Sequence, residues 1–228
     1  MRVALVLTFF LALPQMCLRA DGLVYQLPPD GTIVFFEGVD KSKPKTRLFT
    51  LSIASVGKKS VNGEKCRWIE IKMYGTENDR KIDFLAKILI PEQYLNTGQD
   101  PLKNAIKGNF RYLGLGSDFE KTRDYKESLW LAFFLAAPFK DQQKLSAQFV
   151  STKIGKLECT GIAGTQSFFD QEIRIMAENR LNSKAPFGLV TSELQFVVNN
   201  GGNIETSTVF LRILKTGRNA KSEMPGFE

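Results

Sequence analysis

The chain has 228 residues, 43% of them hydrophobic and 24% charged, with a formal net charge of +7. These values are ordinary for a globular protein with a sizeable core, and a single all-β domain of this length is common. Acidic residues are interspersed with the basic ones, which excludes a basic stripe of the nucleic-acid-binding kind and leaves only weak attraction to an anionic surface. Phenylalanine is used 18 times, against 2 Trp and 5 Tyr, which favours β-structure or an apolar cavity.

Residues 1–20 predict a secretory signal. Arg2 gives a positive start, residues 3–13 form a short apolar region, and 18–20 is an imperfect small-residue cleavage site. Cys17 raises the alternative of lipid attachment, but the three residues before it are not small. An uncleaved membrane anchor is a further alternative, disfavoured because the apolar region is short. We therefore expect an exported protein, in the periplasm or outside the cell, that is not an integral membrane protein after signal removal.

The first half of the chain after the signal predicts a three-stranded antiparallel meander. Alternating apolar residues mark strands at 47–56, 65–74 and 81–90. Asn62-Gly63 is the strongest hairpin signal, because both positions of a type I′ turn need positive φ. A shorter strand is predicted just before the meander, at 32–37.

Residues 91–139 predict a helical insertion. Pro91 opens a short helical turn, and residues 123–137 predict the main helix, closed by Pro138. The apolar run 128–139 is too short to cross a bilayer, which needs about 20 residues as helix. Apolar residues fall all round this helix, so we expect it to be surrounded by protein on more than one side.

The second half repeats the first in style. Strands are predicted at 145–152, 157–168, 171–181, 189–198 and 204–214, followed by a polar, poorly ordered tail at 216–228. Together the segments predict a mainly β fold of about eight strands, as one domain over 21–215. Its antiparallel meanders form a curved sheet or incomplete barrel covered by the central helix.

Residues for enzymatic chemistry are scarce. The chain has no histidine, which excludes Ser–His–acid and Cys–His arrangements and every imidazole metal site. Glu70 and Glu172 are predicted on outward faces of strands, where a solvated surface role is expected. No glycine-rich phosphate loop or calcium loop is present. We expect no catalytic residues, no metal and no cofactor; a two-carboxylate hydrolase is the disfavoured alternative.

Two cysteines remain after signal removal, Cys66 and Cys159. Each comes early in a strand that follows a glycine-containing turn. An exported protein meets oxidising conditions, so a disulfide joining the two meanders is one hypothesis, with a chain-entropy gain of about 4 kcal/mol. Two buried free thiols are the other.

Four stretches, 63–70, 88–95, 155–159 and 184–188, resemble a group of uncharacterised exported bacterial proteins. The resemblance covers most of the mature chain and implies export, but the group has no assigned activity and no functional residue carries over. The layout is also similar, in architecture only, to the periplasmic lipoprotein carriers of the LolA/LolB type, in which an unclosed β-barrel has helices over an apolar concavity. Fold likeness alone does not imply function.

Two hypotheses about function follow. In the first, a non-enzymatic envelope protein binds a lipid or other apolar ligand in the concave face of its sheet. The expected lining is apolar and aromatic: Phe84, Ile88, Trp130, Phe133, Phe134, Ile173 and Ile175. In the second, these residues are ordinary core and the protein is a scaffolding or interaction module that binds an envelope protein.

Overall fold

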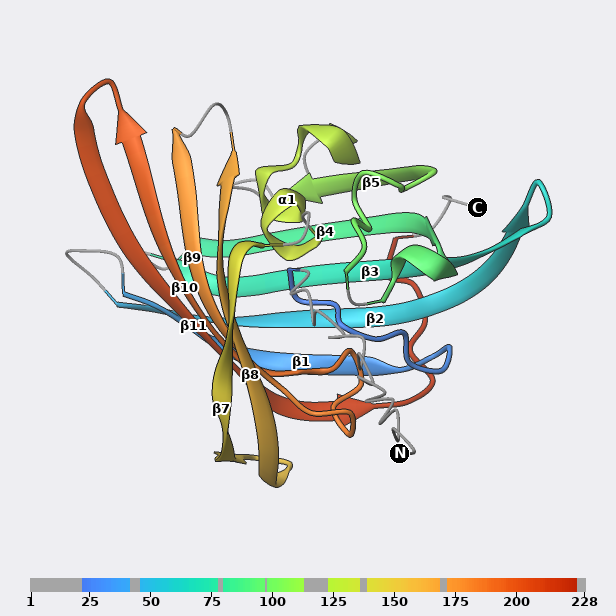
Figure 1. The fold of residues 1–228 in the computed structure, drawn as a ribbon. Helices are drawn as coiled ribbons and strands as arrows, with labels where there is room; N and C mark the ends of the chain where they lie inside the picture. Colours follow the sequence, from blue (N-terminus) through green and yellow to red (C-terminus); the bar gives the residue numbers. More distant parts are fainter. Residues whose placement is uncertain are drawn as a thin grey trace, which may run out of the picture.

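The computed structural model describes residues 22–41, 46–77, 80–96, 98–112, 123–135, 139–168 and 172–224. The predicted signal at 1–20 lies outside the described residues. Eleven strands form one antiparallel sheet in the order β6-β5-β4-β3-β2-β1-β11-β10-β9-β8-β7 (Figure 1). The strands are β1 (Ile33–Asp40), β2 (Arg47–Val61), β3 (Glu64–Glu77), β4 (Arg80–Pro91), β5 (Lys107–Tyr112), β6 (Arg123–Asp124), β7 (Lys140–Thr152), β8 (Gly155–Phe168), β9 (Ile173–Leu181), β10 (Leu189–Asn200) and β11 (Asn203–Gly217).

The sheet consists of two meanders joined side by side by the pairing of β1 with β11. This pair runs from Ile33 opposite Gly217 to Asp40 opposite Val209. Figure 1 shows β1 to β4 lying roughly across the view, while β7 to β10 run steeply up it, so the sheet is strongly bent. Strands β6 and β7 are its two edges, and the sheet does not close. The prediction of antiparallel meanders in an unclosed curved sheet is confirmed.

The predicted hairpin at Asn62-Gly63 forms, and a second hairpin joins β10 and β11. Asn62 (φ 52°) and Gly63 (φ 82°) make the two-residue turn between β2 and β3, as a type I′ turn requires. Gly201 (φ 59°) and Gly202 (φ 98°) make the turn between β10 and β11 in the same way. Positive φ at both turn positions explains why glycine or asparagine occupies them.

The predicted central helix over 123–137 is wrong. The one α-helix among the described residues is α1 (Leu129–Leu135), of seven residues. Residues 123–124 instead pair with β5 as strand β6, and the 3₁₀ turn η2 (Tyr125–Glu127) follows. Ser128 has extended φ and ψ, and its Oγ accepts a hydrogen bond from the Leu131 amide. This serine cap fixes where α1 begins. The turn predicted after Pro91 is confirmed as η1 (Glu92–Tyr94).

Short segments, rather than a covering helix, fill the concave side of the sheet, here called the inner face. They are α1, the N-terminal segment (residues 22–30) and the loop 182–188. Leu23, Phe134 and Phe187 from these three segments join one buried cluster with the inner-face side chains of both meanders. The Leu23 amide donates to the Phe134 carbonyl at 3.0 Å, and the Tyr25 amide to the Phe187 carbonyl at 2.9 Å. The three segments are therefore tied to one another as well as to the sheet.

The described part of the polar tail, through Met224, packs on the opposite, outer face of the sheet. The Glu223 amide and the Ser222 hydroxyl both donate to the carboxylate of Glu70, and Lys72 forms a 2.7 Å ion pair with Glu223. Glu70 is 5% exposed, so this carboxylate is buried under the tail and not on the solvated surface we predicted.

Among the described residues, no helix combines the length and the hydropathy that a membrane span requires.

Candidate functional site

Most of the predicted ligand-lining residues are packed in the core. Phe84, Ile88 and Ile175 on the sheet are at most 2% exposed, and Phe133 and Phe134 on α1 are at most 9% exposed. All five belong to the main cluster of buried side chains. The structure therefore brings these residues of both meanders and α1 together in the packed core.

Two predicted residues stand apart from that set. Ile173 is only partly buried and packs against the main cluster. Trp130 lies on α1, and its side chain lies outside the described residues. Three surface grooves formed by the described residues contain none of the seven predicted residues in their walls.

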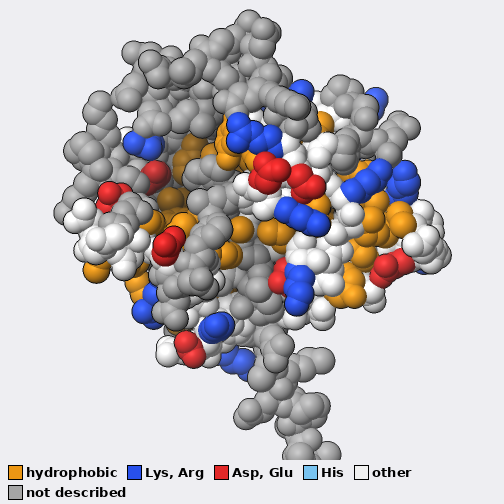
Figure 2. Space-filling model, turned by 90° about the horizontal axis from the view of Figure 1, so that it is seen from above, with side chains coloured by type: hydrophobic (Ala, Val, Ile, Leu, Met, Phe, Trp, Pro, Cys, Tyr) orange, Lys and Arg blue, Asp and Glu red, His pale blue; other side chains and the backbone are white. Residues whose placement is uncertain are grey.

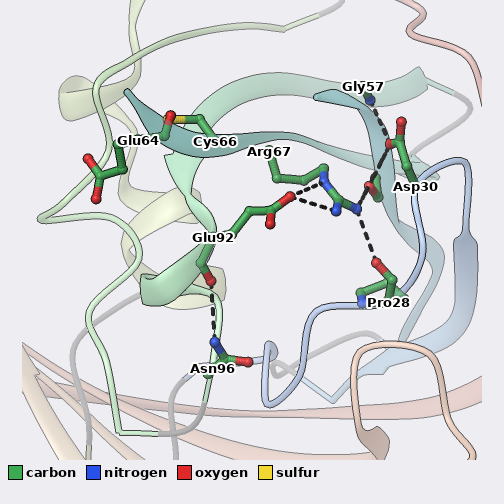
Figure 3. Close-up of polar contacts among 9 residues, drawn as sticks. Pro28, Asp30, Gly57, Glu64, Cys66, Arg67, Glu92 and Asn96 are labelled. Atoms are coloured by element: carbon green, nitrogen blue, oxygen red, sulfur yellow. Dashed lines mark hydrogen bonds and ion pairs between the residues drawn. The ribbon is translucent and has the colours of Figure 1, made fainter. Parts of the chain in front are cut away.

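A buried guanidinium, which the sequence analysis did not single out, joins four segments at one end of the inner face (Figure 3). Arg67 on β3 donates to Oε1 of Glu92 from Nε at 3.1 Å and from Nη2 at 2.7 Å. Its Nη1 donates to the Ser55 hydroxyl at 2.8 Å and to the Pro28 carbonyl at 3.1 Å. The Arg67 side chain is 5% exposed.

The same cluster holds the N-terminal segment in place. Asp30 Oδ1 accepts hydrogen bonds from the Ser55 hydroxyl and the Gly57 amide, both at 2.9 Å, and lies 4.0 Å from Arg67 Nη1. Each of these contacts is made to β2 or β3. Because the donors of Arg67 are taken up by protein acceptors, the arrangement suits a structural ion-pair network and not anion binding or catalysis.

The predicted disulfide is wrong: Cys66 and Cys159 are both free and buried. Cys66 lies on β3 and Cys159 on β8, with five strands between them in the sheet. Cys66 packs with Trp68 and Leu89 in a small cluster on the outer face, whereas Cys159 belongs to the main core. Both cysteines follow a glycine-containing turn, and this similarity favours a disulfide in the sequence. The sheet order instead places their strands far apart.

Burial makes both thiols poor nucleophiles. Desolvation raises the pKa of Cys66 above the ordinary 9.0, and the nearby carboxylates of Glu64 and Glu92 raise it further. Desolvation also raises the pKa of Cys159, although Arg180 opposes the shift. A thiolate is the reactive form of cysteine, so neither residue is suited to nucleophilic catalysis.

These raised pKa values predict a loss of stability in alkali. Groups whose pKa is raised by folding stabilise the native state below their unfolded pKa, and this contribution disappears as the pH rises through the folded pKa. We expect the free energy of unfolding to fall above about pH 9, where unfolded thiols ionise. Urea titrations at several pH values test this, with the Cys66→Ala, Cys159→Ala double variant as the control. An equally steep decline in the double variant would assign the effect to other groups.

A groove of about 740 Å³, here called the outer groove, opens on the outer face of the second meander. Its floor carries outward side chains of β1, β9, β10 and β11, and its wall is the end of β7. Residues 155–159 of β8, which precede Thr160, are not paired with β9, so the turn end of the β7–β8 hairpin continues as a two-stranded ribbon. Figure 1 shows the turn of this hairpin reaching below the other strands. The outer groove is formed where the ribbon leaves the sheet.

The outer groove is lined by charges of both signs and by aromatic rings. Its charged residues are Glu37, Lys41, Glu178, Arg180, Glu193 and Arg212. Phe149, on the ribbon, is 63% exposed, and the Nζ of Lys41 lies 4.5 Å from the ring centre of Phe210. In the view from above, basic and acidic side chains likewise lie next to one another among the described residues (Figure 2). The charges lining the outer groove do not suit the binding of a small apolar molecule, whereas its aromatic and arginine side chains are of the kinds enriched at protein interfaces.

No group of acidic, cysteine and histidine side chains that could hold a metal occurs among the residues that the structure describes.

No family model and no curated protein matches the chain. The solved structures similar to it include the following two. One is a candidate exported protein with a YmcC-like fold from Bacteroides fragilis, with 11% identity, a TM-score of 0.37, and coverage of 84% of this chain and 99% of the other. The other is a candidate lipoprotein from Parabacteroides distasonis, with 15% identity, a TM-score of 0.37, and coverage of 85% and 100%.

Proposed function

We propose that the protein is a non-enzymatic, exported module of the cell envelope that binds a protein partner through its outer face. The observation that carries the proposal is the filling of the inner face by α1, the N-terminal segment and the loop 182–188. Export is supported by the signal pattern at 1–20. The buried, high-pKa thiols and the absence of histidine support a non-enzymatic role.

A lipid carrier is the alternative function, and one observation favours it. The Asn179 Oδ1 and Ser192 Oγ atoms are buried and make no hydrogen bond to any residue that the structure describes, although they lie on cross-strand partners of β9 and β10. Asn179 Nδ2 donates to the Gly22 carbonyl and the Tyr25 hydroxyl of the N-terminal segment. In this alternative the N-terminal segment moves aside, and a ligand's polar group meets these two atoms.

Lipid occupancy separates the two functions. We expect native mass spectrometry of the exported, purified protein to show the mass of the bare chain. We also expect no one-to-one adduct after incubation with phospholipid micelles, because described side chains of α1, the N-terminal segment and the loop 182–188 pack against the inner face. A stoichiometric phospholipid adduct that survives gel filtration, and that Leu211→Trp on the inner face abolishes, would establish the carrier. The matched variant Phe210→Trp, one residue away on the outer face, should leave such an adduct unchanged.

A further inference from the structure

We propose that the outer groove is the interface of a symmetric homodimer, so that one partner of the module is a second copy of the same chain. The proposal rests on the proposed function only in taking the outer face as the interaction surface. The lipid measurement tests the filled inner face separately.

The first observation is the arrangement of charge on the floor of the outer groove. Glu178 and Glu193 are direct cross-strand neighbours on β9 and β10. Like charges in directly opposed positions destabilise a sheet unless they are compensated. Neither carboxylate has a hydrogen bond or ion pair among the described residues. We therefore expect a positive charge on a partner to compensate these two carboxylates.

A second copy of the chain could supply this positive charge from the neighbouring row of residues on the same face. Arg212 stands opposite Thr191, two residues along β10 from Glu193, and is exposed and without a partner among the described residues. Arg180 belongs to the same row, but its guanidinium is held by the Ser146 carbonyl at 2.8 Å. The Arg180 side chain also lies over Gly161 and fills the space of a side chain there, since a Cβ added to Gly161 would lie 2.5 Å from Arg180 Nη1. Arg212 is consequently a cation that can meet a partner.

These positions are self-complementary. In a dimer with two-fold symmetry the same patch faces itself, so residue i of one copy meets residue j of the other and the reverse. A two-fold axis passing between Glu193 and Arg212 brings each Glu193 to the partner's Arg212 in two equivalent ion pairs. Because three acidic and three basic residues line the groove, a partner with a surface of one sign would gain little from it.

Phe149 supplies apolar contact at the wall of the groove. It is 63% exposed, and it lines the groove together with Phe210 and Val39. Aromatic residues are enriched at interfaces, and burying one against a partner adds to the charge pairs. The 15 lining residues are fewer than the about 20–30 per side of a standard interface, so we expect a dimer that dissociates on dilution.

A charge-swap experiment tests the proposal on the full mature chain. Sedimentation equilibrium of the wild type is expected to show a monomer–dimer equilibrium that weakens as salt rises. Glu193→Arg and Arg212→Glu should each raise the dissociation constant at least about tenfold, because each places like charges together twice. An equimolar mixture of the two variants should recover a dimer, since both ion pairs then re-form in the heterodimer.

Two further variants complete the test. Phe149→Ser should weaken the dimer, whereas Ile204→Ser should not, because Ile204 is 69% exposed on β11 outside the groove. Unfolding midpoints equal to that of the wild type exclude misfolding. A wild type that stays monomeric at every concentration overturns the proposal, and so does a mixture of the two charge variants that fails to dimerise. Neither result bears on lipid occupancy of the inner face.

Discussion

Replacing Arg67 with alanine is expected to lower the free energy of unfolding by about 3–5 kcal/mol, the range for removing one partner of a buried ion pair. The guanidinium is 5% exposed and makes four hydrogen bonds to Glu92, Ser55 and Pro28. Its loss leaves the Glu92 carboxylate, which is 27% exposed, without its cation, and the Ser55 hydroxyl and Pro28 carbonyl without their donor. Urea unfolding followed by circular dichroism measures the change.

The chain contains a matched control for this prediction. Lys72 and Glu223 form an ion pair with the same 2.7 Å distance, but their side chains are 29% and 57% exposed. Exposed pairs contribute about 0–1 kcal/mol, so Lys72→Ala should have a small effect. Arg67→Lys should fall between the two, because an ammonium cannot reproduce the forked geometry of the guanidinium. Equal losses in Arg67→Ala and Lys72→Ala would mean that burial does not determine the strength of the Arg67 network.

The strands were predictable because their signal is local. A residue on a half-buried strand alternates between core and solvent with period two, and Asn62-Gly63 specifies a turn within two residues. The pairing of β1 with β11 has no such signal, because its partners are separated by most of the chain. The sequence therefore predicted two meanders but did not show that they join into one sheet.

The helix was overpredicted for a related reason. Residues 123–127 favour a helix by composition, but Arg123 and Asp124 pair with Phe110 and Asn109 on the adjacent strand. A tertiary contact thus outweighs a weak local propensity. Ser128, a residue favoured at helix N-caps, was the available signal for the true start of α1.

Arg67 could have been found from the sequence, whereas the outer groove could not. Arg67 occupies the inward position of the alternation that continues through Ile69, Ile71 and Met73, and a charge at such a position requires a buried partner. Glu193 and Arg212 instead follow the ordinary pattern of outward charges on strands. Their grouping depends on the register of β10 with β11, and the groove above them depends on the point at which β8 leaves β9; both are properties of the folded sheet.

The second large effect is expected from Leu23→Asp, which should destabilise the protein by about 3 kcal/mol or more and expose the inner face. Leu23 is 1% exposed and packs in the main cluster, while its amide donates to Phe134 at the end of α1. Burying an unpaired carboxylate there is costly, and the lost apolar burial adds about 1.5–3 kcal/mol. The N-terminal segment should therefore leave the sheet.

Release of the segment has a separate optical signature. Binding of the dye 8-anilinonaphthalene-1-sulfonate reports exposed apolar surface, so Leu23→Asp should increase its fluorescence under native conditions. Ile204→Asp introduces the same charge at a position already 69% exposed and should leave both stability and dye binding at the wild-type level. If Leu23→Asp lowers stability without any rise in dye fluorescence, other segments close over the vacated surface. In that event α1 and the loop 182–188 alone suffice to cover the inner face, and the N-terminal segment serves to strengthen a cover that is already complete.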